Sequence, residues 1–188
     1  MIDNHIYWGN EQEIDLRHTD ALTLADSMMT FRLAVRELAS HHGVHATFMP
    51  KPLEGVQGSG MHVHLSLFRG DDNAFYDADD EHRLSPLAKS FMAGLLTHAA
   101  EITAITNQTV NSYKRLVPGF EAPVLLIYGL ANSSAAIRIP EAGDTPETKR
   151  IEWRTTDASC NVYLAMAGML MAGLDGIRRK IDPRLAKA

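Results

Sequence analysis

The amino-acid sequence predicts an α+β protein, in which a curved and mainly antiparallel sheet is backed by three long helices. Two observations predict the sheet: several short segments alternate apolar and polar residues, and two of them flank an acidic stretch that suits a hairpin turn. The helices are predicted by three longer segments in which apolar residues recur at steps of three and four, or occupy nearly every position.

The bulk properties limit the class of protein. A chain of 188 residues is long enough for one domain with a sizeable core. The net charge of -5 argues against a nucleic-acid partner, and the single cysteine, Cys160, excludes a disulfide framework or a cysteine-based zinc site. Residues 1–9 do not resemble a signal peptide, and the most apolar segment, Val162–Leu174, is too short to span a bilayer. We expect a cytoplasmic protein that binds neither nucleic acid nor membranes.

The chain begins with a predicted strand and helix. Residues Gln12–Arg17 alternate Ile14 and Leu16 with charged side chains, which is typical of a strand. A helix should follow the capping residues Thr19 and Asp20 and end at Gly43, because apolar residues recur at helical spacing at Leu24, Met28, Phe31, Val35 and Leu38. A short strand at His45–Met49 should then lead into a glycine-rich turn.

The glycine-rich turn and the strand after it are the part of the sequence around which the rest is organised. From Met61 to Phe68, apolar residues alternate with His62, His64 and Ser66, so one face of the strand is polar. Histidines on such a face are costly to bury unless they meet a metal ion, a carbonyl or a phosphate. The glycines allow main-chain N–H groups to approach an anion. These features favour a metal and phosphate site, and exposed histidines beside an ordinary turn are the alternative.

The middle of the chain should contain a loop, a helix and another loop. Residues Arg69–Arg83 are rich in polar residues and glycine and should form a solvent loop or hairpin end. A second long helix should open at Ser85 and Pro86 and extend to Ile102. The segment from Asn107 to Pro123 has no sustained period, and we expect a long loop with a functional role.

The last part of the chain should complete the sheet and end in an apolar helix. Strands are expected at Val124–Tyr128, Ser134–Pro140 and Lys149–Thr155, with the acidic residues 141–147 joining the last two as a hairpin. The segment Val162–Ile181 is apolar on nearly all sides until its basic end, so this helix should be covered on several sides.

The polar faces of these strands should lie together. One sheet face is expected to carry Glu13, His62, His64, Ser66, Arg138, Glu152 and Arg154, with the loop supplying Arg115 and Glu121. Two carboxylates and one neutral imidazole suit magnesium or manganese acting on phosphate oxygens. The arginines would balance the charge of a transferred phosphoryl group. Zinc-dependent hydrolysis is the alternative, although the sequence has no compact His-Glu-x-x-His motif.

Several long motifs occur in one order along the chain. Residues 46–52 read ATFMPKP, 58–64 read GSGMHVH, 111–123 read NSYKRLVPGFEAP, 150–154 read RIEWR, and 163–177 read YLAMAGMLMAGLDGI. They resemble glutamine synthetase of the bacterial type I class, over about residues 13–183. The resemblance implies that residues 1–188 are the middle portion of a glutamine synthetase catalytic domain. An N-terminal grasp-like domain and a C-terminal part would be missing, and family members form homo-oligomeric rings with active sites between subunits.

The resemblance also implies a reaction and a role for each matched residue. ATP would phosphorylate the side-chain carboxylate of glutamate, and ammonia would then displace the phosphate to give glutamine. The metal ligands for Mg²⁺ or Mn²⁺ would be Glu13, His62 and Glu152, and the nucleotide would be bound by Lys51, His64, Ser66, Arg138 and Arg150. The substrate would contact Gln57, Gly58 and Arg115, while Glu121 would take a proton from ammonium and Arg154 would stabilise the phosphoryl group.

Three positions depart from the family pattern. Ile6 stands where the family has a metal-binding carboxylate, Ser133 stands where it commonly has an arginine, and Gln57 replaces a common asparagine. These departures leave two alternatives to glutamine synthesis. One is a related ligase that joins glutamate to a polyamine or alkylamine, and the other is a non-catalytic relative that only binds nucleotide or associates with other subunits.

Overall fold

The computed structural model describes residues 2–6, 12–130, 132–140 and 145–182, and only the backbone of residues 2–6 and 12–13. Its main elements are a six-stranded sheet, a small two-stranded hairpin and five helices within these residues. In chain order the elements are β1 (Ile2–Ile6), β2 (Gln12–Asp15), α1 (Ala21–His41), β3 (Met61–Leu65), β4 (Phe68–Arg69), β5 (Asp72–Asn73), α2 (Pro86–Thr97), α3 (Ala99–Thr106), α4 (Val110–Arg115), β6 (Leu125–Leu130), β7 (Ala135–Ile139), the 3₁₀ turn η1 (Pro146–Thr148), β8 (Ile151–Trp153) and α5 (Val162–Arg179).

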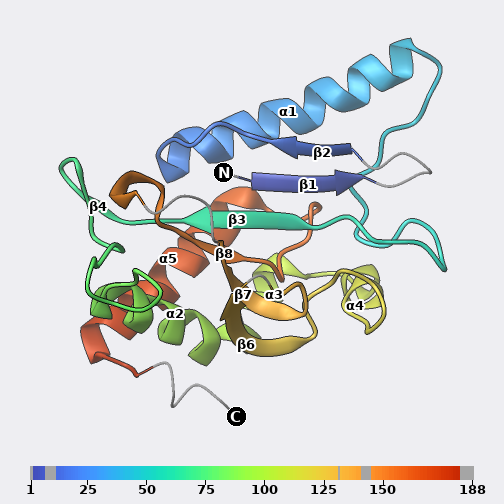
Figure 1. Cartoon of the computed structure of the whole chain (residues 1–188). Helices are drawn as coiled ribbons and strands as arrows, with labels where there is room; N and C mark the ends of the chain where they lie inside the picture. Colours follow the sequence, from blue (N-terminus) through green and yellow to red (C-terminus); the bar gives the residue numbers. More distant parts are fainter. Residues whose placement is uncertain (1, 7–11, 131, 141–144, 183–188) are drawn as a thin grey trace.

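The sheet has the strand order β2-β1-β3-β8-β7-β6, and Figure 1 shows its twist. All neighbouring pairs are antiparallel except β6 and β7, which run parallel with a shift of register between Leu125 and Tyr128. The predicted α+β class with a mainly antiparallel sheet is therefore confirmed. Strand β3 lies in the interior of the sheet, between β1 and β8, and this places the His-x-His segment at the centre of the fold.

The alternation along β3 and β8 separates a core face from a polar face. Met61, Val63 and Trp153 are fully buried and belong to the hydrophobic core. In the pairing of β3 with β8, Val63 lies opposite Trp153 and His64 opposite Glu152. Because successive side chains of a strand point to opposite faces, His64 and Glu152 share the face away from the core.

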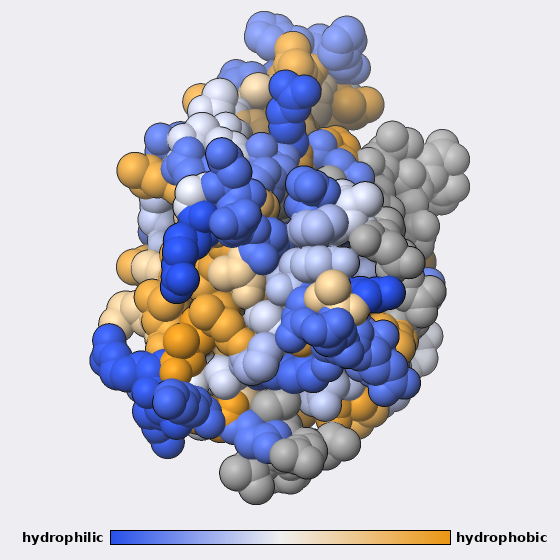
Figure 2. Space-filling model, turned by 60° about the vertical axis from the view of Figure 1, so that its left-hand side comes forward, coloured by the Kyte–Doolittle hydropathy of each residue, from blue (hydrophilic) through white to orange (hydrophobic). Residues whose placement is uncertain are grey.

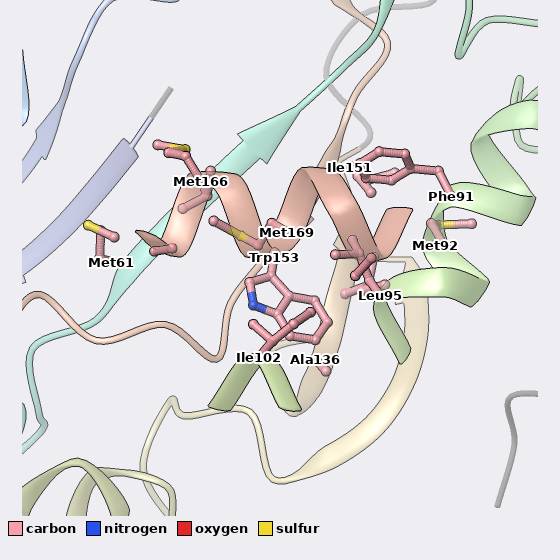
Figure 3. Packing of buried hydrophobic residues seen from close by; sticks show 14 of the residues in the cluster. Met61, Phe91, Met92, Leu95, Ile102, Ala136, Ile151, Trp153, Met166 and Met169 are labelled. Atoms are coloured by element: carbon pink, nitrogen blue, oxygen red, sulfur yellow. The ribbon is translucent and has the colours of Figure 1, made fainter. Parts of the chain in front are cut away.

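Helix α5 passes under the core face of the sheet, and α1, α2 and α3 all contact it. Figure 3 shows Met169 of α5 and Leu95 of α2 beside Trp153, with Met166 farther along α5 and Phe91 of α2 beside Ile151. The apolar character of α5 on nearly all sides follows from this position between the sheet and the other helices.

Helices α2 and α5 cross at glycines. A Cβ atom added to Gly94 would lie 2.2 Å from the carbonyl oxygen of Ala172, and one added to Gly176 would lie 2.1 Å from that of Ser90. The two backbones therefore approach more closely than any side chain would permit. This contact fixes the layer of helices on which the sheet rests.

Helix α1 begins and ends as the sequence predicts. The carboxylate of Asp20 accepts hydrogen bonds from the main-chain N–H groups of Leu22 and Thr23, at 3.1 and 3.0 Å, and caps the helix. Gly43, with φ of 70°, follows its end. Only the N-terminal half of α1 buries apolar residues, and Figure 2 shows apolar surface, coloured orange, beside hydrophilic surface on the face turned toward the viewer. The large apolar side chains exposed on α1 and α5 include Leu22, Leu33, Leu38, Leu164 and Met171.

Three predicted elements differ from the structure. The prediction of a strand at His45–Met49 is wrong: the segment is irregular, and the main-chain N–H of Met49 donates to the Thr47 hydroxyl at 3.2 Å. A strand needs a neighbour to satisfy its main-chain groups, and this segment pairs with none of the described strands. The single long helix predicted from Ser85 to Ile102 is wrong, because the segment forms two helices, α2 and α3. They are separated by His98, whose imidazole lies 2.9 Å from the Asp175 carboxylate.

The predicted long loop at residues 107–123 contains the short helix α4. Its start is fixed by reciprocal capping, in which the Thr109 hydroxyl accepts from the Ser112 main-chain N–H at 3.1 Å and the Ser112 hydroxyl accepts from that of Thr109 at 3.2 Å. Of the predicted solvent loop or hairpin end at residues 69–83, the start is confirmed by the pairing of β4 and β5, whereas Phe75 is buried in the hydrophobic core. Residues 141–144 of the predicted acidic turn lie outside the described residues, and β7 and β8 pair antiparallel as predicted. None of the helices in the described ranges has the length and apolarity that a membrane crossing requires.

Candidate functional site

The candidate site lies on the polar face of β3, β8 and β7, where a buried carboxylate contacts an imidazole and two arginines. Glu152 is 0% exposed, and its Oε1 atom accepts from Arg154 Nη1 at 2.8 Å and lies 3.2 Å from His62 Nδ1. Its Oε2 atom accepts from Arg138 Nε. Strand pairing positions this cluster, because β7 places Arg138 directly opposite Glu152. The structure therefore brings together four of the predicted site residues.

The cluster holds its groups in defined protonation states. Burial lowers the pKa of His62 to about 3, so the imidazole is neutral at neutral pH. Burial alone would raise the pKa of Glu152, but the hydrogen bonds from His62 and Arg138 and the charge of Arg154 outweigh it and lower this pKa to about 2. A neutral imidazole and an ionised carboxylate are the forms in which these side chains bind a divalent cation.

The donor set fits a divalent cation in type. Because His62 Nδ1 donates to Glu152, the imidazole nitrogen left for a metal ion is Nε2, and Glu152 supplies two carboxylate oxygens; nitrogen and oxygen donors of this kind suit Mg²⁺ or Mn²⁺. Within the described residues, no group of three or more histidine, cysteine, aspartate or glutamate side chains is arranged to hold a metal ion. The third predicted ligand, Glu13, belongs to β2, and its side chain lies outside the described part of the structure, as does that of Ile6.

The predicted nucleotide residues lie along the same strands, with one exception. Arg150 Nε donates to His64 Nδ1 at 3.1 Å, which joins the start of β8 to β3. Ser66 follows the end of β3 and is half-buried, and it lines with His64 a cavity of about 410 Å³ that reaches the start of α1. Lys51 instead lies on the glycine turn, where its ammonium group is 3.6 Å from the centre of the Phe120 ring.

The glycine turn and the loop after α4 are joined. Gln57 Oε1 accepts from the main-chain N–H of Glu121 at 2.9 Å, and the Glu121 side chain is exposed. The carbonyl oxygen of Glu121 in turn lies 3.5 Å from Arg154 Nη2, so this loop reaches the cluster around Glu152. A Cβ atom at Gly58 would lie 2.4 Å from the carbonyl oxygen of Pro50, which explains the need for glycine at this point of the turn.

Arg115 is 3% exposed and directs its guanidinium group at the main chain. Nη1 donates to the carbonyl oxygens of Thr155 and Thr156, at 3.1 and 3.3 Å, and Nη2 donates to that of Arg154 at 3.1 Å. Burial lowers the pKa of Arg115 to about 10, and the nearby Asp157 carboxylate opposes this shift, so the group is charged at neutral pH. These three hydrogen bonds of the Arg115 guanidinium group all go to main-chain carbonyl groups of this chain.

Sequence reasoning missed two asparagines that support the site. The side-chain amide of Asn111 accepts from the main-chain N–H of Lys51 at 2.7 Å and donates to its carbonyl oxygen at 2.8 Å, which ties the glycine turn to α4. Asn107, at the end of α3, donates to the carbonyl oxygen of Thr155 at 2.8 Å. Asparagines in a segment without periodicity are common in exposed turns, and only their hydrogen bonds to the main chain reveal the different role.

Comparison with known proteins places the chain in a family. The family model for the catalytic domain of glutamine synthetase matches residues 5–187. The chain is 54% identical over 180 residues to a glutamine synthetase of Thermotoga maritima and 53% identical over 180 residues to one of Thermus thermophilus. Each match covers 96% of this chain and 40% of the relative, so the chain spans about 40% of the length of these curated relatives.

A solved structure agrees with these matches. The structure of a Plasmodium falciparum glutamine synthetase, determined by electron cryomicroscopy, superposes with a TM-score of 0.87 at 41% sequence identity, over 91% of this chain and 33% of that chain. The polar cluster on β3, β7 and β8 is thus set in a fold that a known member of the family shares. The chain belongs to the glutamine synthetase family, and residues 5–187 match the catalytic domain of that family.

Proposed function

We propose that this chain carries part of the active site of an ATP-dependent ligase that joins ammonia to the side-chain carboxylate of glutamate. The observation that carries the proposal is the convergence of His62, Glu152, Arg138 and Arg154 on one buried cluster. Family membership supports the same reaction. The match with bacterial relatives favours the bacterial type I class, and we also propose a cytoplasmic, homo-oligomeric enzyme.

His62 and Glu152 would hold Mg²⁺ or Mn²⁺, together with Glu13 of β2. The cation would neutralise charge on the phosphate oxygens of ATP. Glu152 now accepts hydrogen bonds from both arginines. Arg138 and Arg154 would exchange bonds to this carboxylate for bonds to phosphate oxygens, since guanidinium groups bind such oxygens with two parallel hydrogen bonds.

The remaining residues would bind the nucleotide and the amino acid. His64, Ser66 and Arg150 would contact the nucleotide, while Lys51 would first have to leave its position over the Phe120 ring to reach a phosphate group. Gln57 and Gly58 would present the glycine turn to glutamate. Arg115 is proposed for the substrate carboxylate by resemblance, and this role requires it to exchange a carbonyl partner for the ligand.

Glu121 would take the proton from ammonium. Its side chain is exposed while its main chain is held by Gln57 and Arg154, so the carboxylate could turn toward an ammonium ion bound near the cluster. The loop would also exclude water from the phosphorylated glutamate, which otherwise hydrolyses.

A second candidate function is nucleotide binding without catalysis. Ser133, exposed in the turn between β6 and β7, stands where the family commonly has an arginine. The loss of one donor that stabilises a transition state costs about 2.7–4 kcal/mol in oxyanion holes, and the loss of a guanidinium group aimed at the transferred phosphoryl group should be of that order. A related ligase with a polyamine or alkylamine acceptor is a third arrangement, and Gln57, a longer amide than the usual asparagine, favours it.

Calorimetric titration with ATP, in the presence of Mg²⁺ or Mn²⁺, tests the site. We expect ATP binding that requires the metal and is lost in Glu152→Gln but not in the matched variant Glu147→Gln, on the exposed η1 turn. An absence of binding at millimolar ATP would contradict the proposal. Phosphate release, measured with glutamate and either ammonia or an alkylamine, then separates the three candidate functions. Release with ammonia indicates glutamine synthesis, release with the alkylamine indicates the related ligase, and a protein that only binds nucleotide releases no phosphate with either amine.

A further inference from the structure

Three consecutive carbonyl groups directly after β8 are bound by side chains from one neighbouring segment. The last hydrogen bond from this stretch to β7 is donated by the main-chain N–H of Arg154 to the carbonyl oxygen of Ala136, at 2.9 Å. Beyond it, the carbonyl oxygens of residues 154–156 accept from Arg115 and Asn107. We call Asn107, Arg115 and these three carbonyl groups the carbonyl clamp.

Asn107 is the neutral member of the clamp and is 0% exposed. A buried amide is costly unless it is hydrogen-bonded, and each end of this one has a partner. Nδ2 donates to the carbonyl oxygen of Thr155 at 2.8 Å, and Oδ1 lies 2.8 Å from the Thr106 hydroxyl. The Thr106 contact orients the amide so that its NH₂ group faces Thr155.

The main chain joins the same two segments. The N–H of Asp157 donates to the carbonyl oxygen of Thr106 at 3.3 Å, and the N–H of Met61 donates to that of Thr156 at 2.9 Å. The segment 154–157 is thus held between the end of α3 and the start of β3. Rotation of the backbone at Arg154 would break several of these bonds together.

The clamp lies next to the side chain that we assign to phosphoryl transfer. The backbone of Arg154 is fixed by the clamp, while its guanidinium group reaches Glu152 at 2.8 Å and the carbonyl oxygen of Glu121 at 3.5 Å. We propose that Asn107 is a positioning residue for Arg154, which sets the direction of its guanidinium group through the carbonyl group of Thr155. This inference rests on the proposed function, because it gives Arg154 a role in binding phosphate.

A double-mutant cycle on the full chain tests the inference, with the affinity for ATP and Mg²⁺ as the measured quantity. We expect Asn107→Ala to weaken binding about tenfold, because a misdirected guanidinium group loses a charged hydrogen bond. Gln108→Ala, at the exposed adjacent position, is the control and should bind as the wild type does. In a chain that already carries Arg154→Lys, Asn107→Ala should cause little further loss.

The outcomes separate the clamp from a general structural role. Losses that simply add in the double variant would overturn the inference, because Asn107 would then act independently of Arg154. If Arg154→Lys weakens ATP binding and Asn107→Ala does not, the positioning role of Asn107 is overturned and the proposed function stands. If Arg154→Lys binds ATP as the wild type does, both the positioning role of Asn107 and the role that the proposed function gives to Arg154 are overturned. Should Asn107→Ala fail to fold, Thr106→Val takes its place in the same cycle, since it removes the hydroxyl beside Oδ1 at nearly constant volume.

Discussion

The Nδ1 atom of His62 lies 3.2 Å from Oε1 of Glu152, although 89 positions separate the two residues along the chain. The pairing of β3 with β8 produces this contact, and the two arginines complete the charge environment of the carboxylate. Glu152 is therefore both the predicted metal ligand and a structural anchor. Its two roles give the first prediction.

Replacement of Glu152 by glutamine should destabilise the chain as well as remove metal-dependent ATP binding. The substitution leaves Arg138 and Arg154 without a counter-charge, and breaking such a buried pair costs about 3–5 kcal/mol. Urea unfolding followed by circular dichroism measures the loss, with Glu147→Gln as the exposed control. Equal unfolding midpoints for the two variants would show that the buried ion pairs contribute nothing to stability.

Two glycines of α5 should respond differently to alanine. At Gly176 the added methyl group meets the backbone of α2, which cannot yield, so Gly176→Ala should lose about 1–3 kcal/mol. At Gly168 it meets only the flexible end of Ile105, and alanine favours the helix by up to about 1 kcal/mol. Thermal unfolding should therefore show a large loss for the first variant and a small change of either sign for the second. The reverse order would mean that α2 and α5 do not cross at Gly176.

Stability should fall in acid partly because of Asp80. Burial would raise the pKa of this carboxyl group, but the hydrogen bonds from Lys89 and from the main chain of Leu84 and His82 outweigh it and lower the pKa below the ordinary value of 3.8. The unfolded chain therefore binds the proton more readily, so the contribution of Asp80 is complete above pH 3.8 and is lost as the pH falls through the lowered pKa.

Unfolding free energies measured from pH 6 down to about pH 2 should show this dependence. Asp80→Asn should flatten the acid slope, whereas Asp79→Asn, at an exposed neighbouring position, should leave it unchanged. Identical slopes for both variants and the wild type would contradict the assignment.

Cys160 should be inert in the folded chain. Burial raises the pKa of its thiol from 9.0 to about 12, which the nearby Arg32 guanidinium only partly offsets. Because the thiolate is the reactive form, this shift alone slows labelling at pH 8 by roughly 1,000-fold, before restricted access is considered. A disulfide reagent that releases a coloured thiolate follows the reaction, and since this is the single cysteine the signal has one source. Rapid labelling without denaturant, at the rate seen in urea, would show that Cys160 is not buried.

Much of the fold could be predicted from the sequence because its main elements have strong local patterns. The alternation from Met61 to Leu65 gave β3 and its two faces, and the Asp20 cap and Gly43 gave both ends of α1. The strand predicted at His45–Met49 failed because pairing depends on a neighbour, which no local pattern contains. Helix α4 was missed because its reciprocal cap uses serine at the third position, where glutamate or glutamine is the usual signature.

The sequence predicted which residues form the candidate site better than it predicted the contacts that those residues make. Motif similarity identified His62, Glu152, Arg138 and Arg154, and the strand register explains why they meet. The contacts of Arg115 with three carbonyl oxygens and of Lys51 with Phe120 depend on how two loops fold over the sheet. Such long-range packing of irregular segments leaves no periodic pattern to read.

The charges gathered around Glu152 also affect how ligands should be measured. Arg138 and Arg154 outnumber the single carboxylate that they share, so these three groups together carry one excess positive charge. Chloride and sulfate from the buffer will be drawn to it and will compete with phosphate groups. Dissociation constants for nucleotides should therefore rise steeply with ionic strength, and values from different buffers will be comparable only at one fixed salt concentration.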